Sequence, residues 1–328
     1  MTEAHAILQD IIEAQALLNR VKQEIGKIVV GQSELIDSML IGVLGDGHLL
    51  LEGVPGVAKT LAANSLAKTI RCDFKRIQFT PDLLPADLTG TPIYNSKEGT
   101  FEIKKGPIFT NILLADEINR APAKVQSALL EIMQEKQVSI GGETHSALSP
   151  FLVLATQNPI EQEGTYPLAE AQTDRFMMKV KIGYPTKEEE KVILQRMGNF
   201  SAIAPLSPVL EIKTLLKLRQ LTDSIYLDDR VIDYLLTIVQ ATREPKLFNA
   251  PIEGMLEYGA SPRATLALKR GAKARALLAG RNFVTPQDLK EIAYPILRHR
   301  LRLSYEAEAQ NLNTDDIIRS ILNALSVP

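Results

Sequence analysis

The stretch from Leu49 to Thr60 constrains the fold of this chain more than any other. An apolar run, Leu49 to Leu51, enters a loop that carries Gly53 and Gly56. Lys59-Thr60 then begin an apolar, alanine-rich segment with the character of a helix. The pattern predicts a strand, a phosphate-binding loop and a helix, which is the core of an α/β nucleotide-binding domain.

The composition of this loop explains what it can bind. Gly53 and Gly56 let the backbone curl so that successive N–H groups face a phosphate, and the following helix adds its positive dipole end. Lys59 would reach the β- and γ-phosphates, and the Thr60 hydroxyl would hold Mg²⁺. The general pattern G-x-x-x-x-G-K-[ST] has glycine where this chain has Ala58. We expect the loop to tolerate alanine if this position keeps a negative φ; the alternative is an ordinary strand-to-helix turn.

Composition bounds the class of protein. The chain has 328 residues, 45% of them hydrophobic, which is enough for a large core and suggests two domains. Its formal net charge of -2 gives no global attraction to nucleic acid or to an anionic membrane. Cys72 is the sole cysteine and the four histidines share no ligand spacing with it, so neither an intrachain disulfide nor a structural zinc site is expected. No signal peptide or membrane span is predicted, and we expect a cytoplasmic protein.

A second apolar run ends in two acids. Asn111 to Ala115 reads as a buried parallel strand, and Asp116 and Glu117 follow it directly. Ligands of parallel sheets gather at the carboxyl ends of the strands. Asp116 is therefore suited to the Mg²⁺ shell, and Glu117 to orienting and deprotonating an attacking water. Because acids also cap helices, the pair alone would not establish hydrolysis.

Two further positions have open interpretations. Asn158 follows another buried strand, Phe151 to Ala155, where its amide could contact the attacking water or the γ-phosphate. Asn158-Pro159 is equally a good turn. Two more strands are predicted, at Lys75 to Phe79 and at Met177 to Ile182. Arg175 precedes the second of these and is either a surface ion-pair partner or a charge that stabilises phosphoryl transfer.

The remaining patterns predict the domain organisation. Apolar residues at helical spacing from Ile7 to Ile25 predict an N-terminal amphipathic helix that docks on its own domain or on a neighbouring subunit. Residues 80–107 and 137–147 read as hairpin inserts, the first being either a plain surface excursion or a substrate loop. We place the α/β domain at residues 1–184 and an all-α domain at residues 185–328. The basic run from Arg298 to Arg302 is expected to be a solvated helix end rather than a nucleic-acid site.

Together, five ordered motifs resemble the MoxR family of AAA+ ATPases, and the likeness covers nearly the whole chain. They are Glu52 to Thr60 (EGVPGVAKT), Ala115 to Pro122 (ADEINRAP), Ala155 to Pro159 (ATQNP), Ala169 to Phe176 (AEAQTDRF) and Gly259 to Arg263 (GASPR). Alanine at position 58 is usual in that family. The resemblance implies a P-loop parallel-sheet domain followed by a smaller helical lid, in a ring that is usually hexameric, with ATP between subunits.

The resemblance also implies roles for single residues. Lys59 and Thr60 are similar to the Walker A pair, and Asp116 and Glu117 to the Walker B pair. Asn158 corresponds to sensor 1, Arg175 to the arginine finger that reaches a neighbour's ATP, and Arg263 to a sensor 2 that acts on the ATP of its own chain. The expected nucleotide-binding set is Gly31, Gln32, Gly53, Val54, Pro55, Gly56, Val57, Ala58, Lys59, Thr60, Leu61 and Arg263.

Function remains open beyond ATP and Mg²⁺. The family resemblance implies a chaperone that matures or remodels partner proteins, often ones with a von Willebrand factor A domain. The alternatives are a DNA-directed ring motor similar to the MCM helicases, a magnesium-chelatase-like motor subunit, and a nucleotide-dependent binding module. Net charge gives the DNA motor little support, and the complete set of acid, amide and arginine motifs argues against a binding module.

Overall fold

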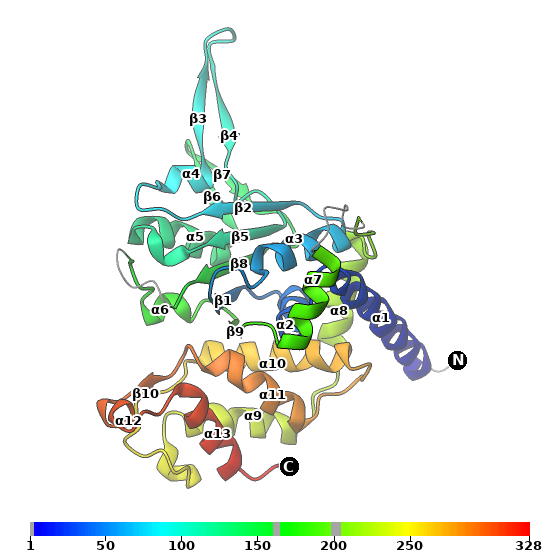
Figure 1. Cartoon of the computed structure of the whole chain (residues 1–328), viewed down its shortest axis with the longest axis vertical. Helices are drawn as coiled ribbons and strands as arrows, with labels where there is room; N and C mark the ends of the chain where they lie inside the picture. Colours follow the sequence, from blue (N-terminus) through cyan, green and yellow to red (C-terminus); the bar gives the residue numbers. More distant parts are fainter. Residues whose placement is uncertain (1–2, 160–164, 198–204) are drawn as a thin grey trace.

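The computed structural model describes residues 3–159, 165–197 and 205–328. Five parallel strands form one sheet in the order β2-β5-β8-β1-β9 (Figure 1). This sheet confirms the predicted α/β class, and every strand predicted for it is present. The strands are β1 (Leu49–Gly53), β2 (Phe74–Gln78), β5 (Ile112–Asp116), β8 (Leu152–Gln157) and β9 (Met178–Ile182).

Helices cover both faces of the sheet, because alternate residues of each strand point to opposite faces. Leu49 and Leu51 belong to the apolar cluster beneath one face, and Leu50 to the cluster beneath the other. The first cluster contains α1 (Glu3–Gly26), α2 (Ser33–Leu44) and α3 (Lys59–Ile70), and the second contains α5 (Ala123–Glu135). Burial on both faces explains why these strands are continuously apolar.

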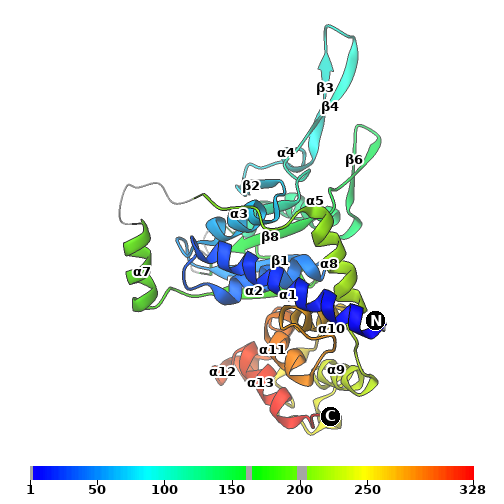
Figure 2. The ribbon, with the colours of Figure 1, turned by 90° about the vertical axis from the view of Figure 1, so that its right-hand side faces the viewer.

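Two hairpins extend from the same end of the α/β domain (Figures 1 and 2). The larger is β3 (Gly90–Asn95) with β4 (Thr100–Lys105), which follows α4 (Pro85–Thr89). The smaller is β6 (Gln137–Ile140) with β7 (Glu143–Ser146). Both hairpins lie within the predicted inserts, at 80–107 and 137–147.

The C-terminal region is helical, as predicted, and its helices lie on the α2 and β9 side of the sheet (Figure 1). Caps at Ser261 and Thr285 begin two of them, where each hydroxyl accepts a backbone N–H of the first turn. The helices after the sheet are α7 (Lys187–Met197), α8 (Ile212–Ser224), α9 (Asp229–Ala241), α10 (Pro262–Leu278), α11 (Pro286–Leu297), α12 (Tyr305–Ala309) and α13 (Thr314–Ala324). Short elements that the sequence did not predict are α6 (Glu170–Thr173), β10 (Leu256–Tyr258) and β11 (Arg302–Leu303).

Packing joins the two regions into one apolar cluster that runs from α1 and β1 to α13. The N-terminal helix α1 buries its predicted stripe from Ile11 to Ile25, whereas Ile7 at its start is 37% exposed, and the helix contacts α3 and α10 of its own chain. The chain itself therefore covers this amphipathic face. The boundary at residue 184 remains a prediction. Within the described ranges, no helix combines the length and apolarity that a membrane crossing needs.

The basic run from Arg298 to Arg302 was expected to be a solvated helix end, and the structure shows that this expectation is wrong for its central part. Arg300 is 7% exposed; its Nε donates to Asp174 Oδ1 at 2.8 Å, and its other nitrogens donate to carbonyl oxygens of residues 174, 176 and 177. Arg298 donates to Asp315 Oδ1 at 3.0 Å. Arg298 and Arg300 are buried because Asp315 and the carbonyl groups before β9 accept their hydrogen bonds, which the sequence alone does not reveal, whereas Arg302 is exposed.

Candidate functional site

The loop between β1 and α3 has the form of a phosphate cradle. Gly56 has φ +86°, a conformation that side chains strongly disfavour, and a Cβ at Gly53 would lie 2.7 Å from the Ile182 carbonyl oxygen. Lys59 Nζ donates to the Gly53 carbonyl oxygen at 2.6 Å. The loop thus places the Lys59 ammonium close to the N-terminus of α3, where the helix dipole also stabilises an anion.

Ala58 differs from the expectation. We expected this residue to keep a negative φ, whereas it has φ +62° and lies in the left-handed region. The glycine that the general phosphate-loop pattern has at this position would adopt this φ without steric cost. Ala58 instead carries strain of roughly 1–2 kcal/mol. The loop imposes this conformation because α3 must begin at the next residue with its N–H groups turned toward the cradle.

Thr156 on β8 fixes the acidic pair at the carboxyl end of β5. Its hydroxyl donates to Asp116 Oδ1 at 2.6 Å and accepts from the Glu117 backbone N–H at 2.8 Å. Glu117 has φ +56°, a second left-handed residue, so the chain turns sharply directly after the strand. Strain of this kind clusters at functional sites, where surrounding contacts over-determine it.

A cavity of about 360 Å³ brings most of the predicted site together at the carboxyl edge of the sheet. We call it the carboxyl-edge cavity. Asn158, predicted at the end of β8, is a buried residue that lines it. Burial lowers the pKa of Lys59, and the Asp116 and Glu117 carboxylates offset part of that effect. The lining residues are Pro55, Gly56, Ala58, Lys59, Thr60, Leu61, Arg76, Gln78, Asp116, Glu117 and Asn158.

A second cavity, of about 320 Å³, lies at the opposite edge of the sheet. Residues 46–48, which precede β1, and Arg175, which precedes β9, line this amino-edge cavity. It is rich in cationic side chains, and within the described residues it shares no lining residue with the first cavity. The lining residues are Asp46, Gly47, His48, Met133, Gln134, Lys136, Asp174, Arg175, Met177, Arg263, Leu266, Ala267, Arg270 and Arg300.

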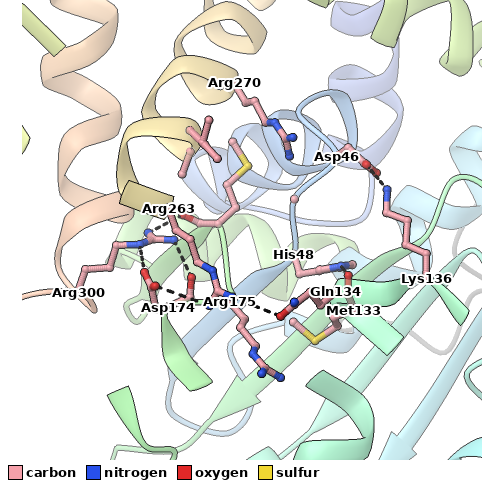
Figure 3. Close-up of a pocket in the computed structure, with 14 residues that line it drawn as sticks. Asp46, His48, Met133, Gln134, Lys136, Asp174, Arg175, Arg263, Arg270 and Arg300 are labelled. Atoms are coloured by element: carbon pink, nitrogen blue, oxygen red, sulfur yellow. Dashed lines mark hydrogen bonds and ion pairs between the residues drawn. The ribbon is translucent and has the colours of Figure 1, made fainter. Parts of the chain in front are cut away.

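Arg263 lies in the amino-edge cavity, and this corrects its expected placement beside the ATP of its own chain. Figure 3 shows it near Asp174 and Gln134. Its Nη1 lies 3.8 Å from Asp174 Oδ2, and its Nη2 donates to Gln134 Oε1 at 3.3 Å. The Ser261 hydroxyl donates to the same Asp174 oxygen at 2.8 Å, which fixes the start of α10 at this edge.

Arg175 is partly buried in the same cavity, but one nitrogen of its guanidinium lacks a hydrogen-bond partner within the described residues. Its Nε is buried and has no hydrogen-bond partner in the described part of the chain. In Figure 3 the guanidinium of Arg175 points away from the cluster around Asp174. An unsatisfied buried donor is costly, which favours a partner that arrives from outside this chain.

Sequence comparisons agree with this geometry. A model of the "ATPase family associated with various cellular activities (AAA)" matches residues 48–178, and an AAA lid domain model matches residues 251–321. "Chaperone MoxR1" of Mycobacterium tuberculosis is 48% identical over 95% of this chain and 82% of its own length. The chain belongs to the MoxR family of AAA+ ATPases. "Protein MoxR" of Paracoccus denitrificans is 31% identical over 95% of this chain and 94% of its own length.

A solved structure supports the same family fold. The protein of Cytophaga hutchinsonii, named provisionally as an ATPase, superposes with a TM-score of 0.94 at 49% sequence identity and covers 100% of both chains. The MoxR arrangement of sheet and helical lid is therefore shared across these proteins. It confirms the predicted fold class of a P-loop domain followed by a lid.

Gly31 and Gln32 lie at a junction rather than in the lining of the carboxyl-edge cavity. Gln32 Nε2 donates to the Gly183 carbonyl oxygen at 3.3 Å. Gly31 has φ +73°, and a Cβ at this position would lie 2.6 Å from Glu189 Oε2 of α7, a carboxylate that caps its own helix through Thr186. Their assignment to nucleotide binding in this MoxR chain remains a prediction.

The donor set of the carboxyl-edge cavity fits Mg²⁺. Thr60 and Asp116 supply hard oxygen ligands, which this ion prefers. Mg²⁺ usually keeps several waters and is held by one or two protein ligands together with phosphate oxygens, so these two side chains are a sufficient set.

Two residues of this MoxR site were missed in the sequence. Arg76 and Gln78 lie on edge strand β2, line the carboxyl-edge cavity and contact the two acids. Their spacing of two places them on one side of the strand. That alternation was visible in the sequence, but only the pairing of β2 with β5 shows that this side meets Asp116.

Proposed function

We propose that this chain is an ATP-hydrolysing subunit of a ring in which each ATP lies between two copies. One observation carries the proposal: the acids and Lys59 lie at the carboxyl edge of the sheet, whereas Arg175 and Arg263 lie at the amino edge. The two edges are separated by strand β1, five residues long, which spans roughly 16 Å. One chain cannot bring both sets to one phosphate, but a head-to-tail contact between copies can.

The carboxyl-edge cavity would bind ATP and perform the chemistry. The loop N–H groups and Lys59 bind the phosphates, and Asn158 and Glu117 orient the attacking water. Glu117 then accepts the proton of that water as it attacks the γ-phosphorus. Thr60 and Asp116 would hold Mg²⁺, which supplies charge neutralisation at the phosphate oxygens.

The amino-edge cavity of the neighbouring copy would complete the site. Arg175, whose Nε has no partner in the described part of its own chain, donates to the γ-phosphate as an arginine finger. Arg263 lies beside it and contributes a second positive charge from the lid. We therefore assign both arginines to the ATP of the neighbouring copy.

The mechanical output would be the remodelling of partner proteins, with a hexamer as the working form. The M. tuberculosis relative carries the name chaperone, which supports this class of function. The β3–β4 hairpin stands away from the sheet and exposes Tyr94 and Phe101, whose rings lie 5.3 Å apart. Such an aromatic pair suits contact with a protein client; we propose von Willebrand factor A domain proteins as the client class.

Mixing two inactive variants tests the shared site. Glu117→Gln removes the base, and Arg175→Ala removes the finger; each alone should lose at least about 10²-fold in ATP hydrolysis. In a random mixture of the two, roughly a quarter of the interfaces combine an intact Glu117 with an intact Arg175 from the neighbour. Phosphate release should therefore recover in the mixture.

The matched control is Arg302→Ala, which removes a surface arginine outside both cavities and should leave hydrolysis near the wild-type rate. Light scattering with and without nucleotide measures the size of the assembly. A mixture as inactive as its two components, although assembled, would contradict a site shared between copies.

A further inference from the structure

Arg76 binds the carboxylate that we assign to the metal. Its Nε and Nη2 lie 3.0 Å and 2.6 Å from Asp116 Oδ2. The other oxygen, Oδ1, accepts the Thr156 hydroxyl at 2.6 Å. Both oxygens of Asp116 are thus engaged by side chains of the chain itself, and Oδ2 is held by the guanidinium of Arg76, which lines the same cavity.

The contact is held in place by a neighbour on the same strand. Arg76 Nη2 also donates to Gln78 Oε1 at 3.3 Å, while Gln78 Nε2 donates to Glu117 Oε2 at 2.7 Å. Two side chains of β2 therefore engage both acids of the site at once. The network orients Arg76 toward Asp116 rather than toward solvent.

We propose that Arg76 is a built-in competitor of the divalent cation: in the resting chain it occupies the cation position on Asp116, and it must leave before Mg²⁺ with ATP binds there. This inference rests on the proposed function. A guanidinium and a dication compete for the same carboxylate because each is stabilised by the same negative charge. The contact thereby raises the cation concentration that the site needs.

The burial of the pair makes this exchange feasible. The Asp116 side chain is 13% exposed, whereas that of Arg76 is 50% exposed. Arg76 can therefore swing into water without leaving a buried positive charge unpaired, while Asp116 keeps its Thr156 bond and its place in the cavity. Because the Arg76 side chain is half exposed and Asp116 keeps its bond from the Thr156 hydroxyl, removal of Arg76 should leave the fold intact.

Direct metal binding tests the proposal. The full chain is saturated with the non-hydrolysable analogue adenosine 5′-(β,γ-imido)triphosphate and titrated with Mn²⁺, whose free form gives an electron paramagnetic resonance signal. Arg76→Gln should bind Mn²⁺ roughly three- to tenfold more tightly than the wild type. The matched control Lys75→Gln removes the same charge one residue earlier on β2, from the other side of the strand, and should bind as the wild type does.

A second titration separates this proposal from the proposed function. Binding of a fluorescent ATP analogue is measured in EDTA for the wild type and Arg76→Gln, after thermal melts confirm that both are folded. Equal affinities in EDTA together with tighter Mn²⁺ binding support the competitor role. Weaker binding by Arg76→Gln in EDTA would make Arg76 a phosphate ligand and overturn that role, as would unchanged Mn²⁺ affinity. A wild type that binds no nucleotide at all would overturn the proposed function itself.

Discussion

The two cavities of this chain differ in their balance of charge. At the carboxyl edge, Asp116 and Glu117 are balanced by Lys59 and Arg76. At the amino edge, cations outnumber acids: Lys136, Arg175, Arg263, Arg270 and Arg300 surround Asp46 and Asp174. Under the proposed function each cavity would be half of a phosphoryl-transfer site, since one would supply the base and the phosphate loop and the other the stabilising charges. This difference is the reason for proposing that a second copy completes the site.

The cavities also differ in how the chain builds them. The carboxyl edge depends on local backbone geometry, with Ala58 and Glu117 both at positive φ. The amino edge depends on long-range side-chain contacts, above all the bonds from Arg300 to the segment at residues 174–177. A substitution in the loop at the carboxyl edge should therefore act through the local backbone, whereas loss of Arg300 at the amino edge should break contacts between segments that are far apart in the sequence.

The largest effect is expected from Arg263→Ala, which tests the assignment of this residue to the neighbour's ATP. Loss of one preorganised charge at the transferring phosphoryl should reduce hydrolysis roughly hundredfold. Mixed with Glu117→Gln, the variant should regain activity. Mixed with Arg175→Ala it should not, because both arginines would come from the same face of one copy.

The reverse pattern in phosphate-release assays would mean that Arg263 acts on the ATP of its own copy. Recovery with Arg175→Ala but not with Glu117→Gln would mean that Arg263 and Glu117 serve the same ATP from one copy. The expected pattern instead keeps the two cavities on separate copies, as their positions at opposite edges imply.

Arg300→Ala should come next, as a loss of stability. The Arg300 side chain is 2% exposed, so its removal leaves Asp174 Oδ1 and several carbonyl groups without the Arg300 donor, while Asp174 Oδ2 keeps the Ser261 hydroxyl. We expect the free energy of unfolding to fall by about 3 kcal/mol. Arg302→Ala is the matched control, since Arg302 and Glu170 are both more than half exposed; it should cost less than about 1 kcal/mol. Denaturant titration measures the free energy of unfolding of both variants. Equal losses of stability would contradict the stabilising role of the Arg300 contacts.

The amino-edge cavity should also make stability depend on pH through His48. Burial lowers the pKa of His48 to about 4, although its bond to the Met133 carbonyl opposes the shift. Its Nδ1 accepts the Val153 N–H, so the folded chain requires the neutral ring. The unfolded chain binds the proton below about pH 6.5, so stability falls as the pH drops from there to about 4, by up to ~3 kcal/mol.

Urea unfolding at pH 7 and at pH 4.5 checks this prediction. His48→Gln retains a donor and an acceptor at this position but cannot be protonated, so it should lose less stability between these two pH values than the wild type. Equal losses in the two proteins would show that His48 does not carry the effect.

The smallest effect is expected at the carboxyl edge, from Ala58→Gly. Glycine adopts φ +62° without the steric cost that alanine pays, so the free energy of unfolding should rise by up to about 1 kcal/mol. Ala128→Gly inside helix α5 is the control and should lower it by about the same amount. Thermal unfolding compares the stabilities of the two variants. A less stable Ala58→Gly would contradict the inference that Ala58 is strained.

The sequence predicted the sheet and the carboxyl edge well, because their signals are local. Apolar runs, the glycine loop and an acid pair after a strand each specify their own backbone, and parallel strands bring their carboxyl ends together. Arg76 and Gln78 escaped this reasoning because their role depends on which strand lies next to β2. Arg300 escaped it because a basic run reads as surface until its carbonyl partners are known.

The sequence by itself determined what chemistry the chain can hold: a phosphate loop, two acids and an amide at strand ends, and a helical lid that carries Arg263 at the start of one helix. Only the tertiary structure decided where those groups meet. Helix α10 of the lid packs on α1 and α2 at the amino edge of the sheet, so Arg263 lies beside Arg175 instead of Lys59. Helix periodicity specifies which face of a helix is buried; it carries no information on which surface that face will cover.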